Sequence, residues 1–303
     1  MSSLKKKWAL EVDRMLTPNI MPKLSVCSLK KAIEHVEIYN FNYTKYMLGG
    51  AANVAKCVKS RNVDSHLYGY IGNDSAGKVV KDLLNDIGQK NVHVVDALNT
   101  TVKNRLVVNN EIKCRIDYEN NVKICSREFE LDLLSSIDMY SSIIISDYQK
   151  GVLNRDFIRK IVKVAVSKDI PIFIDSKSSD MEQYNGADYA IITLDEYNQI
   201  MKTKFNSLFQ VGIYGFSFLN MHSVKNLIIK NNVEGSMLFS HKNKQPVHTV
   251  DKAEAVCAIG AGDVYISNFC VEILNGSSIE NAFRVANMKA AKSVESFFTC
   301  CEE

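Results

Sequence analysis

The 303-residue sequence has little proline, no long apolar run and little net charge, and each scarcity excludes a class of protein. With 4 prolines and no low-complexity block, nothing in it resembles a linker, so we expect one domain over residues 1–303. No apolar stretch approaches the about 18 residues that a membrane span needs, which argues against a membrane protein. The formal net charge of the chain is only +3, and its lysines and arginines are scattered along the sequence, which argues against nucleic acid as a partner.

The cysteines lack the CxxC spacing of zinc and redox motifs. Several lie inside apolar runs, as Cys270 does between Phe269 and Val271. This placement predicts reduced, mostly buried thiols, and therefore a cytosol-like, cytoplasmic location rather than a disulfide framework.

Apolar runs of strand length alternate with amphipathic segments of helix length in the middle of the chain. Residues 142–146, 171–175 and 189–193 have the first pattern, and residues 155–168, with Asn154 as a cap, have the second. Continuous apolar strands separated by amphipathic helices predict a mostly parallel central sheet with helices on both faces. The expected fold class is therefore α/β, in three α/β/α layers.

Two regions break this pattern, because their apolar and polar residues alternate as in half-exposed strands. They are residues 35–42 and 105–117, and Asn109 and Asn110 suit a hairpin turn in the second. These strands predict a small β-sheet that projects from the main domain as a lid. The first thirty residues show no clean strand, so no structure is predicted for them.

A glycine turn precedes a helical pattern that runs to about Leu274. It consists of Gly260, Ala261, Gly262 and Asp263. Glycines before a helix let a ligand approach the unpaired backbone N–H groups, whose dipoles favour the negative charge of a phosphoryl group in transfer. A carboxylate directly after them is placed to accept the proton of an attacking hydroxyl. The alternative is an ordinary glycine turn followed by an aspartate.

A second glycine segment offers a tight turn with a polar side chain behind it. Gly49 and Gly50 permit the turn, and Asn53 presents a donor and an acceptor to sugar hydroxyls. Close helix packing explains the neighbouring alanines equally well, but it does not explain Asn53. In the next glycine-containing turn, an N-cap role for Asp74 or Ser75 is favoured over ligand binding.

Polar residues follow two successive strands of the predicted sheet. Asp147 and Lys150 come after the first strand, and Asp175 and Lys177 end the second. Ligands of open α/β sheets bind at the carboxyl ends of strands, so these residues predict a polar site with a cation for phosphate.

In this order, the motifs resemble the phosphofructokinase-B (pfkB, ribokinase-like) family of sugar kinases, from about Leu48 to Val294. They are most similar to the kinase domain of bifunctional heptose-7-phosphate kinase/adenylyltransferase enzymes. The resemblance implies ATP as phosphoryl donor, Mg²⁺ as metal and a sugar or sugar phosphate as acceptor, with heptose 1,7-bisphosphate as the product. It also implies Asp263 as the catalytic base and a homodimer formed through the lid strands.

The resemblance further implies two groups of binding residues. Those for the acceptor are Gly49, Gly50, Asn53, Arg105, Arg115, Asp117, Asp147, Lys150 and Lys177. Those for the nucleotide are Thr193, Glu196, Lys230, Gly235 and Asn287, with Glu196 also as the magnesium ligand.

The chain also departs from the family pattern. The leading strand that ends in Gly-Asp has only a faint counterpart at residues 12–16, and Cys257 and Ile259 replace the Asp and Thr before the glycine turn. Thr193 and Lys230 stand where the family has an Asn and a nucleotide-contacting Thr. Two functions follow: an active sugar or sugar-phosphate kinase, or a degenerate pseudokinase retained as a binding or structural partner. A kinase of nucleosides or small alcohols is a third alternative.

Overall fold

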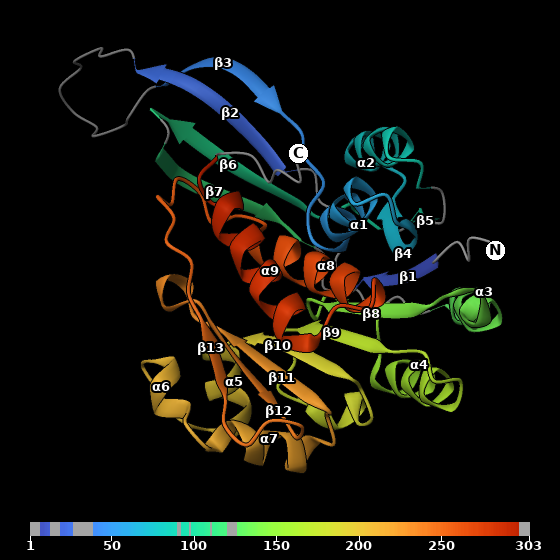
Figure 1. The fold of residues 1–303 in the computed structure, drawn as a ribbon. Helices are drawn as coiled ribbons and strands as arrows, with labels where there is room; N and C mark the ends of the chain where they lie inside the picture. Colours follow the sequence, from blue (N-terminus) through green and yellow to red (C-terminus); the bar gives the residue numbers. More distant parts are fainter. Residues whose placement is uncertain are drawn as a thin grey trace.

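A nine-stranded sheet forms the centre of the computed structural model, which describes residues 7–12, 19–26, 39–89, 92–96, 98–109, 111–119 and 126–296 (Figure 1). Its spatial order is β13-β12-β11-β10-β9-β8-β1-β4-β5, and neighbouring strands pair in parallel except for the antiparallel pairs β11–β12 and β12–β13. These strands are β1 (Lys7–Val12), β4 (Asp64–Gly72), β5 (Val92–Val95), β8 (Ser142–Asp147), β9 (Ile172–Ser176), β10 (Tyr189–Thr193), β11 (Asn226–Lys230), β12 (Ser236–Ser240) and β13 (Val247–Thr249).

Helices cover both faces of this sheet, which makes the three layers predicted from the sequence. One face packs against α1 (Ala51–Ser60), α2 (Ser75–Asp86), α8 (Ala261–Leu274) and α9 (Ile279–Ser293). The other packs against α3 (Arg127–Ser136), α4 (Arg155–Ser167), α5 (Leu194–Met201), α6 (Leu208–Val211) and α7 (Tyr214–His222). In Figure 1, α8 and α9 cross the near face of the sheet.

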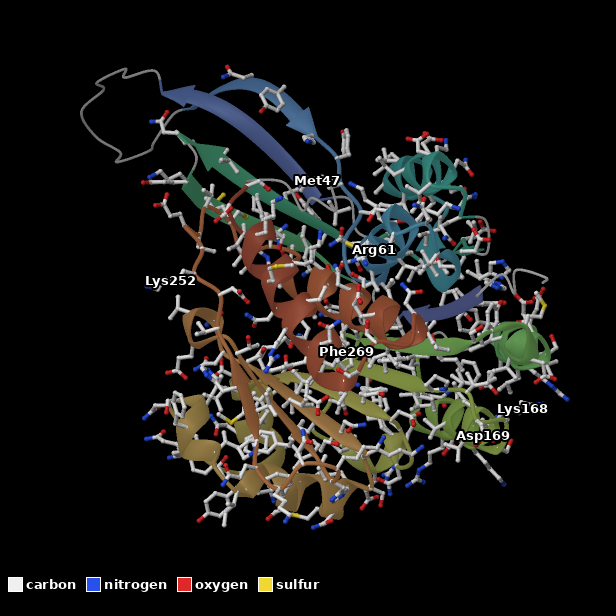
Figure 2. All side chains as sticks on the ribbon, viewed as in Figure 1. Met47, Arg61, Lys168, Asp169, Lys252 and Phe269 are labelled. Carbon is white, nitrogen blue, oxygen red and sulfur yellow. The ribbon has the colours of Figure 1, made fainter. Side chains whose placement is uncertain are left out.

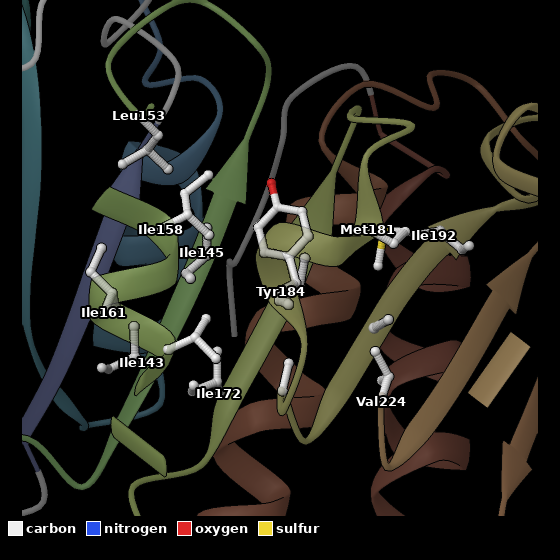
Figure 3. Close-up of a cluster of buried hydrophobic side chains, with 14 of the residues drawn as sticks. Ile143, Ile145, Leu153, Ile158, Ile161, Ile172, Met181, Tyr184, Ile192 and Val224 are labelled. Atoms are coloured by element: carbon white, nitrogen blue, oxygen red, sulfur yellow. The ribbon is translucent and has the colours of Figure 1, made fainter. Parts of the chain in front are cut away.

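The apolar runs are continuous because each central strand is buried on both sides. Successive side chains point to opposite faces, so Ile143 and Ile145 belong to the core under α4, whereas Ile144 belongs to the core under α8. Figure 3 shows Ile143 and Ile145 facing Ile158 and Ile161 of α4. The predicted strands and helix are thus confirmed, with bounds that differ by a residue or so.

The prediction that the first thirty residues hold no clean strand is wrong. β1 lies in the middle of the sheet, where Leu10 pairs with Leu67 of β4 and with Ile144 of β8. Its sequence gives a weak signal because Lys7 and Glu11 interrupt a six-residue run. Asp13, the residue that follows β1, lies outside the described residues. The chain therefore does have a leading strand.

A second, four-stranded sheet projects from the main one, in the order β3-β2-β6-β7 (Figure 1). Its strands are β2 (Asn19–Val26), β3 (Tyr39–Lys45), β6 (Val102–Val108) and β7 (Glu111–Tyr118). The strand predicted at 35–42 begins at Tyr39, and the region predicted at 105–117 is the hairpin of β6 and β7. Asn110 of its turn lies outside the described residues.

One apolar contact joins the small sheet to the glycine turn. Met47, after β3, and Val107 of β6 are buried together, and Ile259 packs against them. Figure 2 shows Met47 where β3 leads toward α1. Ile259 therefore contributes packing at the position where the resembled family has a threonine.

The N-cap expected at Asp74 is confirmed, and its loss should destabilise the protein. Asp74 accepts hydrogen bonds from Gly77 N (2.7 Å), Thr100 N (2.8 Å) and Thr100 Oγ1 (2.7 Å). Burial alone would raise the pKa of Asp74, but these hydrogen bonds lower it below its usual value. At pH 7, Asp74→Ala should lower the free energy of unfolding by about 2 kcal/mol in urea titrations.

The pH dependence of that loss is a further test. A depressed pKa gives stability that is fully present above the ordinary aspartate pKa of about 4 and disappears as pH falls through the folded-state pKa. The difference between wild type and Asp74→Ala should therefore shrink in acid. Asp82→Ala, at an exposed position of α2, is the matched control and should cost nothing. Equal stability of the two variants at pH 7 would contradict the role of Asp74.

The cysteines follow the prediction in part. Cys257 and Cys270 are free and buried, and Cys114 is free but exposed. Cys57 is disulfide-bonded, so the prediction of reduced thiols is wrong at this position. Its partner lies outside the described residues, and sequence spacing gives no sign of the pair.

Among the helices in the described ranges, none is long and apolar enough to cross a membrane.

Candidate active site

A cavity of about 800 Å³ lies at the carboxyl ends of the central strands, where open α/β sheets bind ligands. The starts of α1 and α8, the ends of β8 to β11, α9 and the segment after β13 all contribute to it. The predicted site residues that line it are Gly49, Gly50, Asn53, Arg105, Lys177, Thr193, Lys230, Gly235, Gly260, Ala261, Gly262, Asp263 and Asn287.

Asp263 lies in the first turn of α8, and two side chains hold its carboxylate. Asn53 Nδ2 donates to Oδ2 at 2.9 Å, and the Tyr148 hydroxyl donates to Oδ1 at 3.1 Å. Asp263 is only 5% exposed although it lines the cavity. The carboxylate is thus fixed in orientation, which suits a group that must receive a proton from a bound hydroxyl.

The start of α8 is open to an anion. Gly260 has φ +81°, a left-handed conformation that favours glycine, and none of the side chains in the described ranges caps the helix. Ala261 N donates to Ala258 O at 3.4 Å, a long hydrogen bond. First-turn amides lack partners within a helix, so the amide of Gly262 is available to a ligand.

Asn287, which was predicted for the nucleotide, belongs to a hydrogen-bond network on the β11–β12 side of the cavity. Asn287 Nδ2 donates to Asp251 Oδ2 at 2.6 Å, and Ser236 Oγ donates to Asn287 Oδ1 at 2.9 Å. Ser236 also bonds the hydroxyl of Tyr265 (3.0 Å), whose pKa is raised strongly by burial. This network fixes the wall of the cavity next to Gly235.

Glu196 and Thr193 begin α5 as a capping box. Thr193 N donates to Glu196 Oε2 at 2.8 Å, and Glu196 N donates to Thr193 Oγ1 at 3.3 Å. The other oxygen of Glu196 pairs with Lys177 Nζ, which lies 5.7 Å from the centre of the Tyr148 ring. Glu196 is therefore engaged on both oxygens and does not itself line the cavity.

Comparison with known families identifies the family to which this chain belongs. The pattern of the pfkB family carbohydrate kinases matches residues 23–301. The chain belongs to the pfkB family of carbohydrate kinases. As a pfkB kinase it is a phosphotransferase with a hydroxyl group as acceptor.

Similar sequences occur in bacteria. An uncharacterized sugar kinase of Buchnera aphidicola subsp. Schizaphis graminum is 31% identical over 273 residues, which cover 88% of this chain and 84% of that protein. The bifunctional protein HldE of Haemophilus influenzae strain PittEE is 30% identical over 249 residues, which cover 80% of this chain and 51% of that protein. The chain thus spans about half the length of the HldE proteins that it matches.

Solved structures show the same fold. Arabidopsis thaliana ribokinase, complexed with ribose and ATP, superposes with a TM-score of 0.75 at 18% identity, covering 97% of this chain and 94% of that one. Phosphofructokinase-2 of Escherichia coli with fructose-6-phosphate gives 0.74 at 14% identity, covering 95% and 93%. The predicted ribokinase-like fold is therefore confirmed.

Asp147 of the pfkB kinase does not reach the cavity. It is fully buried and accepts hydrogen bonds from Gln149 N (2.8 Å), Ser176 Oγ (3.3 Å) and the hydroxyl of Tyr184. Its carboxylate thus holds together the loops after β8 and β9.

Three other predicted acceptor residues of the pfkB kinase lie in an ion-pair network of the small sheet. Arg115 bonds Asp117 through two nitrogens at 2.6–2.7 Å, which holds the pKa of that carboxyl well below its usual range. Lys103 pairs with Asp117 and with Glu119, and Lys150 Nζ pairs with Glu119 at 2.5 Å. Arg115, Asp117 and Lys150 therefore lie outside the cavity, and Glu119 ties the small sheet to the loop after β8.

Sequence reasoning gave no role to Tyr148, and it included Asp175 in the predicted polar site without assigning it a binding role. Both line the cavity, and Oδ1 of Asp175 is buried without a hydrogen-bond partner. Tyr148 and Asp263 are 115 residues apart in the chain, so no motif spacing reveals their contact. The sequence shows Asp175 only as another polar residue at the end of a strand, and it does not show the unpartnered Oδ1.

Proposed function

We propose that the protein transfers the γ-phosphoryl group of ATP to a hydroxyl of a sugar or sugar phosphate, with an acceptor of the heptose-7-phosphate type. The observation that carries this is the Asp263 carboxylate, held by Asn53 and Tyr148 at the uncapped start of α8. The HldE relatives and the sequence motifs support the choice of acceptor class.

Different residues have different roles in the phosphoryl transfer. Asp263 accepts the proton of the acceptor hydroxyl as its oxygen forms a bond to the γ-phosphorus, while the bond from that phosphorus to the bridging oxygen breaks and ADP leaves. The amide of Gly262 and the α8 dipole stabilise the charge on the phosphoryl oxygens. Oδ1 of Asn53 is buried without a partner, so it is available to an acceptor hydroxyl.

The residues of the cavity fit a nucleotide better than they fit its metal ion. Its size, the uncapped α8 and the wall at Gly235 and Asn287 fit a nucleoside triphosphate. In the described ranges no group of three or more His, Cys, Asp or Glu residues is arranged to hold a metal ion. Mg²⁺ is bound mostly by phosphates and water with one or two carboxylates, so Asp175, whose Oδ1 has no hydrogen-bond partner, would hold it in place of the predicted Glu196, whose two oxygens are engaged. Bound there, Mg²⁺ would neutralise phosphate charge.

An ADP-release assay with a panel of sugars and sugar phosphates tests this function. We expect Mg²⁺-dependent ADP formation that needs an acceptor and that is highest with a heptose phosphate. Absence of both ADP release and nucleotide binding would instead support the partner-protein alternative.

A phosphate on the acceptor should be recognised by Arg105. Arg105 reaches the cavity from β6 and is 7% exposed, and Lys177, which also lines the cavity, is paired with Glu196. A charge-assisted hydrogen bond contributes about 1.5–3 kcal/mol, so kcat/KM should be at least about tenfold higher for the sugar phosphate than for the free sugar. Arg105→Met should abolish that ratio, and Arg159→Met, on exposed α4, should leave it unchanged. Equal kcat/KM values in wild type would rule out a phosphate-reading cation.

The small sheet is the proposed dimer contact. β7 forms one edge of that sheet, and every residue of the strand is exposed. An edge strand with unpaired backbone groups favours pairing with a second chain.

A further inference from the structure

Lys230, the last residue of β11, brings its ammonium group to the start of α8. Nζ lies 3.5 Å from the point where a Cβ on Gly262 would sit. Apart from the helix's own atoms, nothing else that the structure describes comes within 4 Å of that point. The space around that point is therefore open, with the Lys230 ammonium group beside it.

Among the described residues, no carboxylate neutralises the charge of Lys230. Throughout the described ranges it forms no ion pair, in contrast to Lys177. Its Nζ lies 5.8 Å from the centre of the Tyr265 ring, a favourable but uncharged contact. The N-terminus of a helix repels a cation, so this placement is unfavourable unless an anion lies between the two.

The position of Asp263 identifies that anion. Asp263 is the next residue after Gly262, so the space between the amide and Lys230 adjoins the carboxylate that accepts the proton. We infer that Lys230 binds the terminal phosphate of the nucleotide, together with the Gly262 amide, at the position where the resembled family has a threonine. This inference rests on the proposed function and assigns Lys230 as a source of positive charge at its phosphoryl-transfer site.

Calorimetric titration of Lys230→Met with ATP, ADP and AMP tests the inference without relying on turnover. Loss of a charge-assisted contact to the terminal phosphate should raise the Kd for ATP at least about tenfold and leave the Kd for AMP within about twofold. Lys230→Arg should keep most of the ATP affinity. Lys252→Met is the matched control, because Lys252 also lines the cavity but lies on the exposed segment between β13 and α8 (Figure 2). It should change the affinity for the three nucleotides equally.

An ATP affinity of Lys230→Met within twofold of wild type would overturn the inference, as would equal weakening of ATP and AMP binding. Lys230→Gln serves as a second uncharged variant if the methionine variant is poorly folded. Failure of the proposed function gives a different result, because wild type itself would then bind none of the three nucleotides.

Discussion

Asp263→Asn should lower turnover by at least about 100-fold, the usual scale for loss of a general base, with no loss of folding. An amide has the shape of the carboxylate and still bonds Asn53 and Tyr148, but it cannot accept the proton of the acceptor hydroxyl. Removal of a negative charge beside the phosphates should leave ATP binding equal or tighter. Steady-state ADP release and calorimetry measure the two effects separately.

The matched control is Asp169→Asn. Asp169 follows α4 with φ +54°, a conformation that asparagine also adopts readily, and Figure 2 places it far from the glycine turn. Its turnover should equal that of wild type. Full activity of purified Asp263→Asn would remove Asp263 from the mechanism.

Gly235→Ala should lower the free energy of unfolding by at least about 3 kcal/mol. Gly235 has φ +77°, and a Cβ there would lie 2.1 Å from the carbonyl oxygen of Thr249, a backbone atom that cannot move aside cheaply. The turn also holds Asn231, whose N–H donates to Gly235 O at 2.9 Å, directly after Lys230. ATP affinity should therefore fall together with stability.

Gly88→Ala separates the cost of the positive φ from the cost of the contact with Thr249. Gly88 has a similar φ of +73°, but no atom lies within 4 Å of its added Cβ. It should cost about 1 kcal/mol, the effect of the backbone conformation alone. Equal losses in urea titrations of the two variants would show that the contact with Thr249 has no effect.

The layers and the glycine turn are predictable from the sequence because their signals are local. β8 to β10 are short apolar runs, and the turn at Gly260 directly precedes a periodic helix. β1 escapes prediction because its place between β4 and β8 compensates for two charged residues, and that compensation depends on neighbours far along the chain.

The candidate site is predictable only as a set of strand ends. The sequence indicates that polar residues follow β8 and β9, but not which of them face the cavity. Tyr148 faces it and Asp147 does not, because Tyr184 bonds the latter from a different segment. Contacts of this kind depend on tertiary packing, which residue spacing does not report.

The buried carboxylate of Asp147 also affects how related chains should be compared. Its hydrogen bonds to Tyr184 and Gln149 hold two loops in place. A related chain that no longer transferred phosphate would still use this aspartate to hold these loops in place. Within the segment Ser146-Asp147-Tyr148, the aspartate is thus a marker of architecture and cannot separate active relatives from inactive ones. The tyrosine after it, which contacts Asp263, is the more informative position for that purpose.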